Sequence, residues 1–204
     1  MESIILASAS PRRKELLQQI NMEFQVVPSQ CEETIIGNAP EEIVQELARQ
    51  KAEEVVQRLS LPGRIVLGAD TVVAFENQIL GKPSDRKEAL EMIRLLQGKE
   101  HQVYTGVCLS FLQGSGEIIS RNFYEKTSVI VNPMSEAEIN AYIDGSFQQD
   151  KESGLQWADK AGAYGIQGCF AAFIKEIRGD YNNVVGLPIS RVYEELKVLI
   201  PGKI

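Results

Sequence analysis

The sequence predicts an α/β fold with a mixed β-sheet, on two observations. Short apolar runs alternate with amphipathic helical segments in the first part of the chain, and a pair of long strand-like segments joined by a Gly-rich turn follows. The first pattern is typical of parallel strands, and the second of an antiparallel hairpin. The 204 residues are enough for one domain, and no linker or repeat divides them, so we predict a single domain over residues 1–204.

The first part of the chain is expected to contain short buried strands and one long helix. Ser10 offers a helix N-cap and Pro11 a first helical residue, whereas Pro62-Gly63 stops the long helix. Its apolar residues, Ile43, Leu47, Ala52, Val55, Val56 and Leu59, recur at helical spacing. The elements expected here are a strand over 4–7, a helix from 11, a strand over 24–27 and a helix from 40.

The middle of the chain is expected to be rich in strands. Asp85 predicts a helix N-cap and Gly98 the end of that helix, and Ser135 to Glu138 form a capping box for another helix that runs to about Ile143. The strands expected here are a central strand over 64–69, a hairpin of 72–75 with 78–80, and a long hairpin of 102–112 with 118–131.

The last part of the chain begins with a polar segment, 145–159, which we expect to be an exposed loop. Apolar residues then predict strands over 170–177 and 183–185, around a turn at 178–180. Pro188 opens the last helix.

Charge and composition exclude several classes of protein. Hydrophobic residues make up 44% and charged residues 24%, which is typical of a globular chain. The 21 basic and 28 acidic residues give a net charge of −7, so we expect no nucleic-acid partner and no anionic membrane surface as a partner. No apolar run approaches the roughly 20 residues of a membrane span, and the N-terminus has no basic leader.

Cysteine and histidine usage narrows the chemistry further. Cys31, Cys108 and Cys169 lie far apart, which predicts reduced thiols rather than disulfides or a zinc site, and fits a cytoplasmic protein. The single histidine, His101, nearly excludes Ser-His-Asp chemistry and histidine-rich metal sites.

A segment rich in hydroxyls and cations, Ser8 to Lys14, follows the first expected strand. Cations at a helix N-terminus meet its partial positive charge, so they are locally unfavourable there. An anionic ligand reverses that balance, because free N–H groups, the Ser8 hydroxyl and the guanidinium groups of Arg12 and Arg13 all suit phosphate. The residues alone leave two interpretations: a phosphate site, or a capped helix with solvated cations.

Asp70 follows the expected central strand, where α/β proteins often place reactive groups beside a ligand crevice. Its carboxylate can accept a proton from water or bind a divalent cation, and a turn or capping role is the alternative. Glu33, next to Glu32 on a loop, is a second candidate metal ligand, although such carboxylates are often simply solvated.

Two lysines and one glycine-rich segment complete the candidates. Lys82 stands between Gly81 and Pro83, which suits a lysine held toward phosphate or an exposed hairpin residue, whereas Lys51 in the long helix is unremarkable alone. In the segment 159–168 glycines permit close approach to a ligand, and the amide of Gln167 can bind a base edge. A merely tight connection is the alternative, since neither a Walker loop nor a GxGxxG pattern is present.

The candidate segments described above, in their order along the chain, resemble those of the Maf nucleotide pyrophosphatases, also called septum formation inhibitors. The resemblance includes Tyr104 to Val107, Gly179 to Tyr181 and Asn183 to Pro188, and it covers about residues 3–199. It implies a two-lobed mixed-sheet fold similar to that of the inosine triphosphate pyrophosphatases, with a central nucleotide cleft. One departure is a longer segment between Asp144 and Asp159.

The resemblance also implies an activity and a site. The activity is hydrolysis of a nucleoside triphosphate to the monophosphate and pyrophosphate with Mg²⁺ or Mn²⁺, and a homodimer is expected from the family alone. Asp70 matches the proposed general base and, with Glu33, the carboxylates near the metal. The phosphate-contacting positions of the family match Ser8, Arg12, Arg13, Lys51 and Lys82.

The resemblance further indicates a base preference. The subfamily that acts on dTTP and UTP has Arg, Thr and Gln where this chain has Arg13, Thr71 and Gln167, and a subfamily acting on 7-methyl-GTP has Glu at the last position. An amide offers a donor and an acceptor for the O4 and N3–H edge of a pyrimidine, whereas a carboxylate only accepts. We therefore expect dTTP and UTP, with modified pyrimidine nucleotides, as substrates.

Two other functions stay open at this point. One is a nucleotide-binding regulator of cell division or septum formation without significant turnover, and the other is a phosphatase that releases orthophosphate. An intact base at Asp70 argues against a pure binder. The products formed from a nucleoside triphosphate separate all three.

Overall fold

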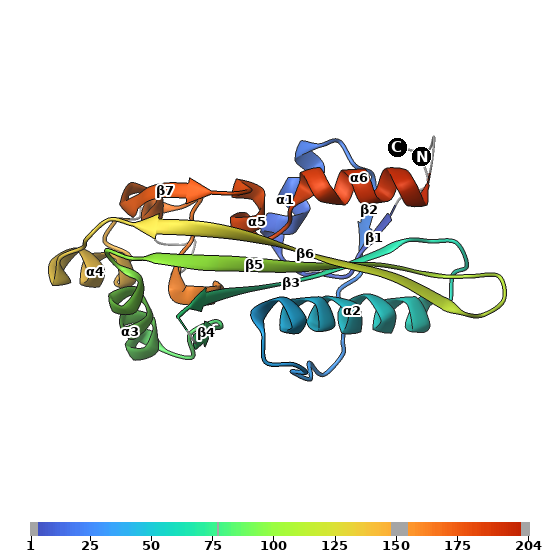
Figure 1. Ribbon diagram of the computed structural model, residues 1–204, viewed down its shortest axis with the longest axis horizontal. Coiled ribbons are helices and arrows are strands. Elements are labelled where there is room, and N and C mark those ends of the chain that lie inside the picture. Colours follow the sequence, from blue (N-terminus) through green and yellow to red (C-terminus); the bar gives the residue numbers. More distant parts are fainter. Residues whose placement is uncertain (1–3, 77, 148–154, 201–204) are drawn as a thin grey trace. The chain divides into compact units, whose positions relative to one another are not determined.

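The computed structural model describes residues 4–76, 78–147 and 155–200, and it has the expected mixed α/β architecture (Figure 1). The described strands are β1 (Ile4–Leu6), β2 (Phe24–Val26), β3 (Val66–Phe75), β4 (Gln78–Leu80), β5 (Glu100–Leu112), β6 (Ile118–Val131) and β7 (Ile174–Arg178). The described α-helices are α1 (Pro11–Gln19), α2 (Pro40–Leu59), α3 (Arg86–Leu96), α4 (Glu136–Ile143), α5 (Tyr181–Val185) and α6 (Ile189–Leu199). Short 3-10 helices, η2 (Ala161–Ala163) and η3 (Cys169–Phe173), precede β7.

The described strands form one mixed sheet in the order β2-β1-β3-β5-β6-β7, with β4 paired to β3. Strand β1 is parallel to both of its neighbours, with Ile5 opposite Val66 on β3. The β3–β4 and β6–β7 pairs are antiparallel. This combination of parallel and antiparallel pairs confirms the predicted fold class.

The chain groups into two compact units. The first unit contains residues up to Thr71, residues 104–125 and residues from Gly186 onward; the second contains residues 72–103 and 126–185. Strands β3, β5 and β6 contribute residues to both units.

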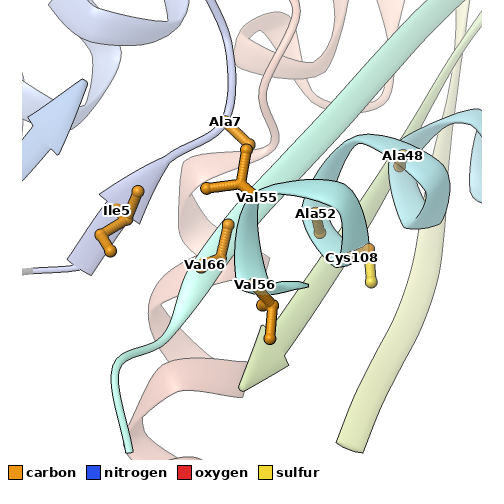
Figure 2. Close-up of a cluster of buried hydrophobic side chains, with 8 residues drawn as sticks. All are labelled: Ile5, Ala7, Ala48, Ala52, Val55, Val56, Val66 and Cys108. Carbon is orange, nitrogen blue, oxygen red and sulfur yellow. The ribbon is translucent and has the colours of Figure 1, made fainter. Parts of the chain in front are cut away.

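The first unit has its core between α2 and the sheet. Figure 2 shows a cluster of small and β-branched side chains from β1, the residue after β1, α2, β3 and β5: Ile5, Ala7, Ala48, Ala52, Val55, Val56, Val66 and Cys108. Helix α2 lies on one side of the strands of this unit, and α1 and α6 lie on the other (Figure 1). Burial of these apolar surfaces on both faces fixes the position of α2 against the strands.

Two glycines let α2 approach the sheet closely. A Cβ atom at Gly68 of β3 would lie 2.2 Å from the Ala48 carbonyl oxygen, and one at Gly106 of β5 would lie 2.2 Å from the Val44 carbonyl oxygen. Any side chain at either position would push the helix away from the strands. Residues on the sheet-facing edge of α2 therefore lie unusually close to β3 and β5.

The second unit packs α3 and α4 with the glycine-rich segment. The helix boundaries agree with the sequence: the Asp85 side chain accepts a hydrogen bond from Glu88 N at 2.8 Å, and Ser135 and Glu138 form the predicted capping box. Aromatic rings fill the space around the segment, with ring centroids of Tyr164 and Phe170 4.8 Å apart.

The sequence prediction for residues 64–75 is wrong in one respect that concerns the site. Strand β3 continues from Val66 to Phe75, so Asp70 and Thr71 lie inside a strand rather than after one. The first part of β3 pairs with β1 and the last part with β4, and these pairings keep the backbone extended across the polar residues.

Two further predictions in the last part of the chain need correction: the strand predicted over 170–177 begins only at Ile174, as β7, and the strand predicted over 183–185 is a helix. Residues 169–173 are a 3-10 helix and 181–185 are helix α5, not strands. At α5 the Asp180 carboxylate accepts from Asn182 N at 2.7 Å, and Asn183 Nδ2 donates to the Val103 carbonyl at 3.1 Å. These polar contacts outweigh the strand preference of the neighbouring valines.

The segment expected to be an exposed loop is only partly so. Residues 148–154 lie outside the described residues, but Trp157 is buried, and its indole N–H donates to the Ile143 carbonyl at 2.9 Å. Cys31, Cys108 and Cys169 are free in the structure, and their reduced state stays a prediction. Within the described ranges, no helix is long and apolar enough to cross a membrane.

Candidate active site

The Arg13 guanidinium joins three distant segments of the first unit. Its Nε donates to the Gly186 carbonyl at 2.8 Å, and its terminal nitrogens donate to Ser8 Oγ at 3.0 Å and Thr71 Oγ1 at 3.1 Å. The Thr71 hydroxyl also lies 2.9 Å from the Thr105 hydroxyl of β5. Arg13 therefore holds together the β1–α1 turn, the middle of β3 and the turn before α6.

The β1–α1 turn has the features of an anion site. Ser8 is buried at the end of β1, and its hydroxyl accepts from Ser10 N at 3.2 Å. Ser10 is the N-cap of α1 as predicted, but its side chain makes no capping hydrogen bond, and Arg12 and Arg13 follow Pro11 in the first turn. Uncapped N–H groups together with guanidinium groups are favourable to a phosphate at this end of the helix.

Electrostatics link Arg13 to the nearby carboxylates. Burial lowers the pKa of Arg13 and is the largest effect, the negative charge of Asp70 opposes it, and smaller contributions come from Arg12 and Glu33. A guanidinium keeps its proton at neutral pH even in such surroundings. The site therefore contains the permanent positive charge of Arg13, which interacts with the negative charges of Asp70 and Glu33.

An ion-paired cluster lies beside this network. The Lys51 ammonium from α2 is 2.6 Å from Asp70 Oδ1 on β3 and 3.0 Å from Glu33 Oε1 on the loop before α2. The side chains of Lys51 and Asp70 are 14% and 15% exposed, so this pair is largely shielded from water, whereas Glu33 is 50% exposed. The close approach of α2 to the sheet at Gly68 is what brings Lys51 to Asp70.

The loop that carries Glu33 is tied to α2 by side chains one helical turn apart. The Gln50 amide donates to the Thr34 carbonyl at 2.8 Å and accepts from Thr34 N at 3.0 Å. One turn further along, Glu54 Oε2 accepts from Gln30 N at 3.1 Å. These contacts fix the backbone on both sides of Glu33, although the loop has no regular secondary structure.

The carboxylates of Asp70 and Glu33 suit a divalent cation of the Mg²⁺ type. Such ions take oxygen ligands, and commonly one or two carboxylates with water and substrate phosphates rather than a complete protein cage. Within the part of the chain that the structure describes, no group of three or more His, Cys, Asp or Glu could hold a metal ion. Asp70 and Glu33 supply two carboxylates, which is the number that Mg²⁺ commonly takes from a protein when water and substrate phosphates are its other ligands.

The remaining candidates, Lys82 and Gln167, belong to the second unit, and both side chains are exposed. The backbone beside Gln167 is well anchored. Gly165 N donates to the Tyr142 hydroxyl at 3.3 Å, and Cys169 N donates to the Gln156 side chain at 3.0 Å. Gln167 thus presents an exposed amide between two anchored backbone positions.

Sequence reasoning missed three residues that build the site. Thr105 and Gly186 lie in two strings that carry the family resemblance but have no predicted role, and Gly186 has a φ of +129° that favours glycine. Gln50 has no sequence signal at all, because its two bonds to Thr34 depend on how the loop folds back onto α2.

Comparison with known proteins gives consistent matches along the chain. A family model described as Maf-like protein matches residues 3–199. A dTTP/UTP pyrophosphatase of Agathobacter rectalis is 51% identical over 98% of this chain and 98% of its own. One from Lachnoclostridium phytofermentans is 46% identical over 97% of this chain and 95% of its own. Among solved structures, a HAM1 protein from Coxiella burnetii is 17% identical with a TM-score of 0.43, over 64% of this chain and 73% of that one.

Proposed function

The chain belongs to the Maf-like protein family, and we propose that it is a nucleoside triphosphate pyrophosphatase that hydrolyses dTTP and UTP. The products are the nucleoside monophosphate and pyrophosphate, and modified pyrimidine triphosphates are included among the substrates. The observation that carries the proposal is the convergence of Asp70, Glu33 and Lys51 beside the Arg13 network. Carboxylates and cations together are what attack by water on a phosphate requires.

Asp70 is proposed as the general base. It orients the attacking water and accepts its proton while the water oxygen bonds to the α-phosphorus. The bond from that phosphorus to the bridging oxygen breaks, and pyrophosphate leaves with the electron pair. Phosphoryl-type transfers depend on positioning and charge stabilisation, so a rigid strand is a suitable support for this carboxylate.

The phosphate charge is proposed to be met by Ser8, Arg12, Arg13, Lys51 and Lys82. The Ser8 hydroxyl accepts from Arg13 and from Ser10 N, so its own proton can be donated to a phosphate oxygen. Arg13 has five N–H groups, and those not used by Gly186, Ser8 and Thr71 can bind phosphate. Glu33 and Asp70 would hold a Mg²⁺ or Mn²⁺ ion, which supplies positive charge to the triphosphate.

The base is proposed to be selected by Gln167, with Arg13 and Thr71 as the other members of the pyrimidine-type set. An exposed amide that offers both a donor and an acceptor suits the O4 and N3–H edge of uracil and thymine. Residues 1–204 are proposed to act as one functional domain in the cytoplasm, with a homodimer expected from the family.

The test is a panel of nucleoside triphosphates with Mg²⁺ or Mn²⁺, in which pyrophosphate and orthophosphate are measured separately. Pyrophosphate release that is fastest with dTTP and UTP supports the proposal. Binding without product would indicate the nucleotide-binding regulator, and orthophosphate as the first product would indicate a phosphatase.

A further inference from the structure

Lys51 makes contacts that a simple phosphate-binding lysine does not need. Its ammonium lies between two carboxylates from different segments, 2.6 Å from Asp70 and 3.0 Å from Glu33. Two of its three N–H donors are thereby committed to acidic partners. Both carboxylates are the proposed ligands of the divalent cation. The Lys51 ammonium therefore lies between the carboxylate oxygens that would bind this cation.

The ammonium and a divalent cation cannot share these carboxylates in the observed arrangement. Mg²⁺ binds carboxylate oxygens at about 2.0–2.1 Å, which would place it next to an ammonium that touches the same oxygens. The repulsion between like charges at such a distance is strong beside Asp70, because the Lys51 and Asp70 side chains are only 14% and 15% exposed. Binding of the cation by both carboxylates therefore requires the Lys51 ammonium to move.

We infer that Lys51 is a built-in counter-ion that keeps Asp70 and Glu33 from binding free divalent cations and releases them to a cation that arrives with the triphosphate. This inference rests on the proposed function. The triphosphate supplies the new partner, because its phosphates offer the displaced ammonium negative charge that water does not. The long flexible stem of lysine allows this exchange without movement of α2.

The inference makes nucleotide and cation binding mutually dependent. Without nucleotide, the cation must displace Lys51 into a site that already contains the Arg13 charge. With nucleotide, the same displacement gives the ammonium a phosphate partner. Each ligand therefore strengthens binding of the other, and such couplings commonly amount to about 5–150-fold in affinity.

The experiment measures Mn²⁺ binding in the absence of nucleotide, by the electron paramagnetic resonance signal of the free ion. Lys51→Met is compared with the wild type and with Lys87→Met, which removes the same charge from an 85% exposed side chain on α3. We expect Lys51→Met to bind Mn²⁺ at least about tenfold more tightly than the wild type, and Lys87→Met to stay within about twofold. The tighter binding of Mn²⁺ should disappear in the double variant Lys51→Met/Asp70→Asn. Its disappearance would show that the ion binds at the carboxylates.

A second arm adds a non-hydrolysable UTP analogue. After subtraction of the Mn²⁺ that the analogue binds in a sample without protein, the wild type should bind Mn²⁺ at least about tenfold more tightly than without the analogue, and Lys51→Met should gain less. Unchanged or weaker Mn²⁺ binding by Lys51→Met without nucleotide would overturn the inference. Lys51→Gln, which keeps a hydrogen-bond donor but no charge, gives the same comparison if the methionine variant does not fold.

The inference and the proposed function fail in different ways. If the wild type releases pyrophosphate from dTTP or UTP while Lys51 variants bind Mn²⁺ no more tightly, only the inference is wrong. If the wild type releases no pyrophosphate from any triphosphate, the proposed function is wrong, and the Mn²⁺ measurements with and without the UTP analogue alone decide the inference.

Discussion

Asp70 combines a rigid position with an immediate positive partner. It lies inside β3, its side chain is 15% exposed, and the Lys51 ammonium is 2.6 Å from one of its oxygens. We predict that Asp70→Asn keeps the fold but lowers kcat by at least about 10²-fold, because the amide cannot accept a proton from water. Steady-state release of pyrophosphate measures the loss.

The control for this variant is its circular dichroism spectrum and its melting temperature. An unchanged spectrum with a low kcat assigns the effect to the chemistry. If Asp70→Asn keeps most of the wild-type kcat, Asp70 is not the base, and its pairing with Lys51 is structural.

Gln167 is the residue whose substitution tests base selection most directly. Its side chain is exposed, while hydrogen bonds from Gly165 N and Cys169 N fix the backbone on either side. Gln167→Glu keeps the size of the side chain, and in the proposed pairing with the base it would place a carboxylate oxygen opposite the pyrimidine O4. An unsatisfied polar contact costs about 1–3 kcal/mol, so kcat/KM for UTP should fall at least about tenfold relative to that for GTP.

A matched variant, Gln57→Glu, makes the same change at an exposed position of α2. It should leave the ratio of kcat/KM for UTP over GTP unchanged. If Gln167→Glu also leaves this ratio unchanged, Gln167 does not contact the base.

At the scale of elements, the contact between α2 and the sheet controls both stability and the site. We predict that Gly68→Ala lowers the free energy of unfolding by about 1–3 kcal/mol, because its Cβ would lie 2.2 Å from the Ala48 carbonyl oxygen. The helix must shift, and Lys51 shifts with it, so kcat/KM for dTTP should fall as well. Urea denaturation and steady-state kinetics measure the two effects.

The matched control is Gly114→Ala in the β5–β6 turn, where a new Cβ would meet nothing within 4 Å. This variant should change the free energy of unfolding by no more than about 0.5 kcal/mol. Equal effects of the two variants would show that close packing of α2 is unimportant.

The same elements show what the sequence can predict. Local signals predicted correctly the capped helices, such as the one begun by Ser135, and the long β5–β6 hairpin. They failed at Asn183, where bonds to distant residues make a helix from a strand-like string.

The candidate site likewise has one part that the sequence predicts and one part that depends on contacts between distant residues. Ser8 and Asp70 are predictable from their strings and from the family resemblance. The ion pairs of Lys51 with Asp70 and Glu33 depend on the packing of α2 against the sheet at Gly68, and no local pattern encodes that distance.

At the scale of the whole molecule, His101 couples protonation to folding. The ring is fully buried, and its Nε2 lies 2.7 Å from the Tyr164 hydroxyl of the glycine-rich segment. Among the described residues, its Nδ1 has no hydrogen-bond partner. Burial lowers the pKa of His101 to about 4, because a charged ring would lose its hydration inside the protein.

The sign of the pH effect follows from this shift. The unfolded chain binds a proton at His101 below pH 6.5, whereas the folded protein binds it only near pH 4, so stability falls as the pH decreases between these values.

We predict a loss of about 2 kcal/mol in the free energy of unfolding between pH 7 and pH 5. The pKa of the Glu46 carboxylate is lowered by its hydrogen bond to Arg49, so this carboxylate titrates below the range between pH 7 and pH 5. Because His101 is the only histidine of the chain, urea denaturation of His101→Gln isolates its contribution. This variant should be less stable at pH 7 but should lose most of the slope between pH 7 and pH 5. Parallel curves for the two proteins would show that another group causes the pH dependence.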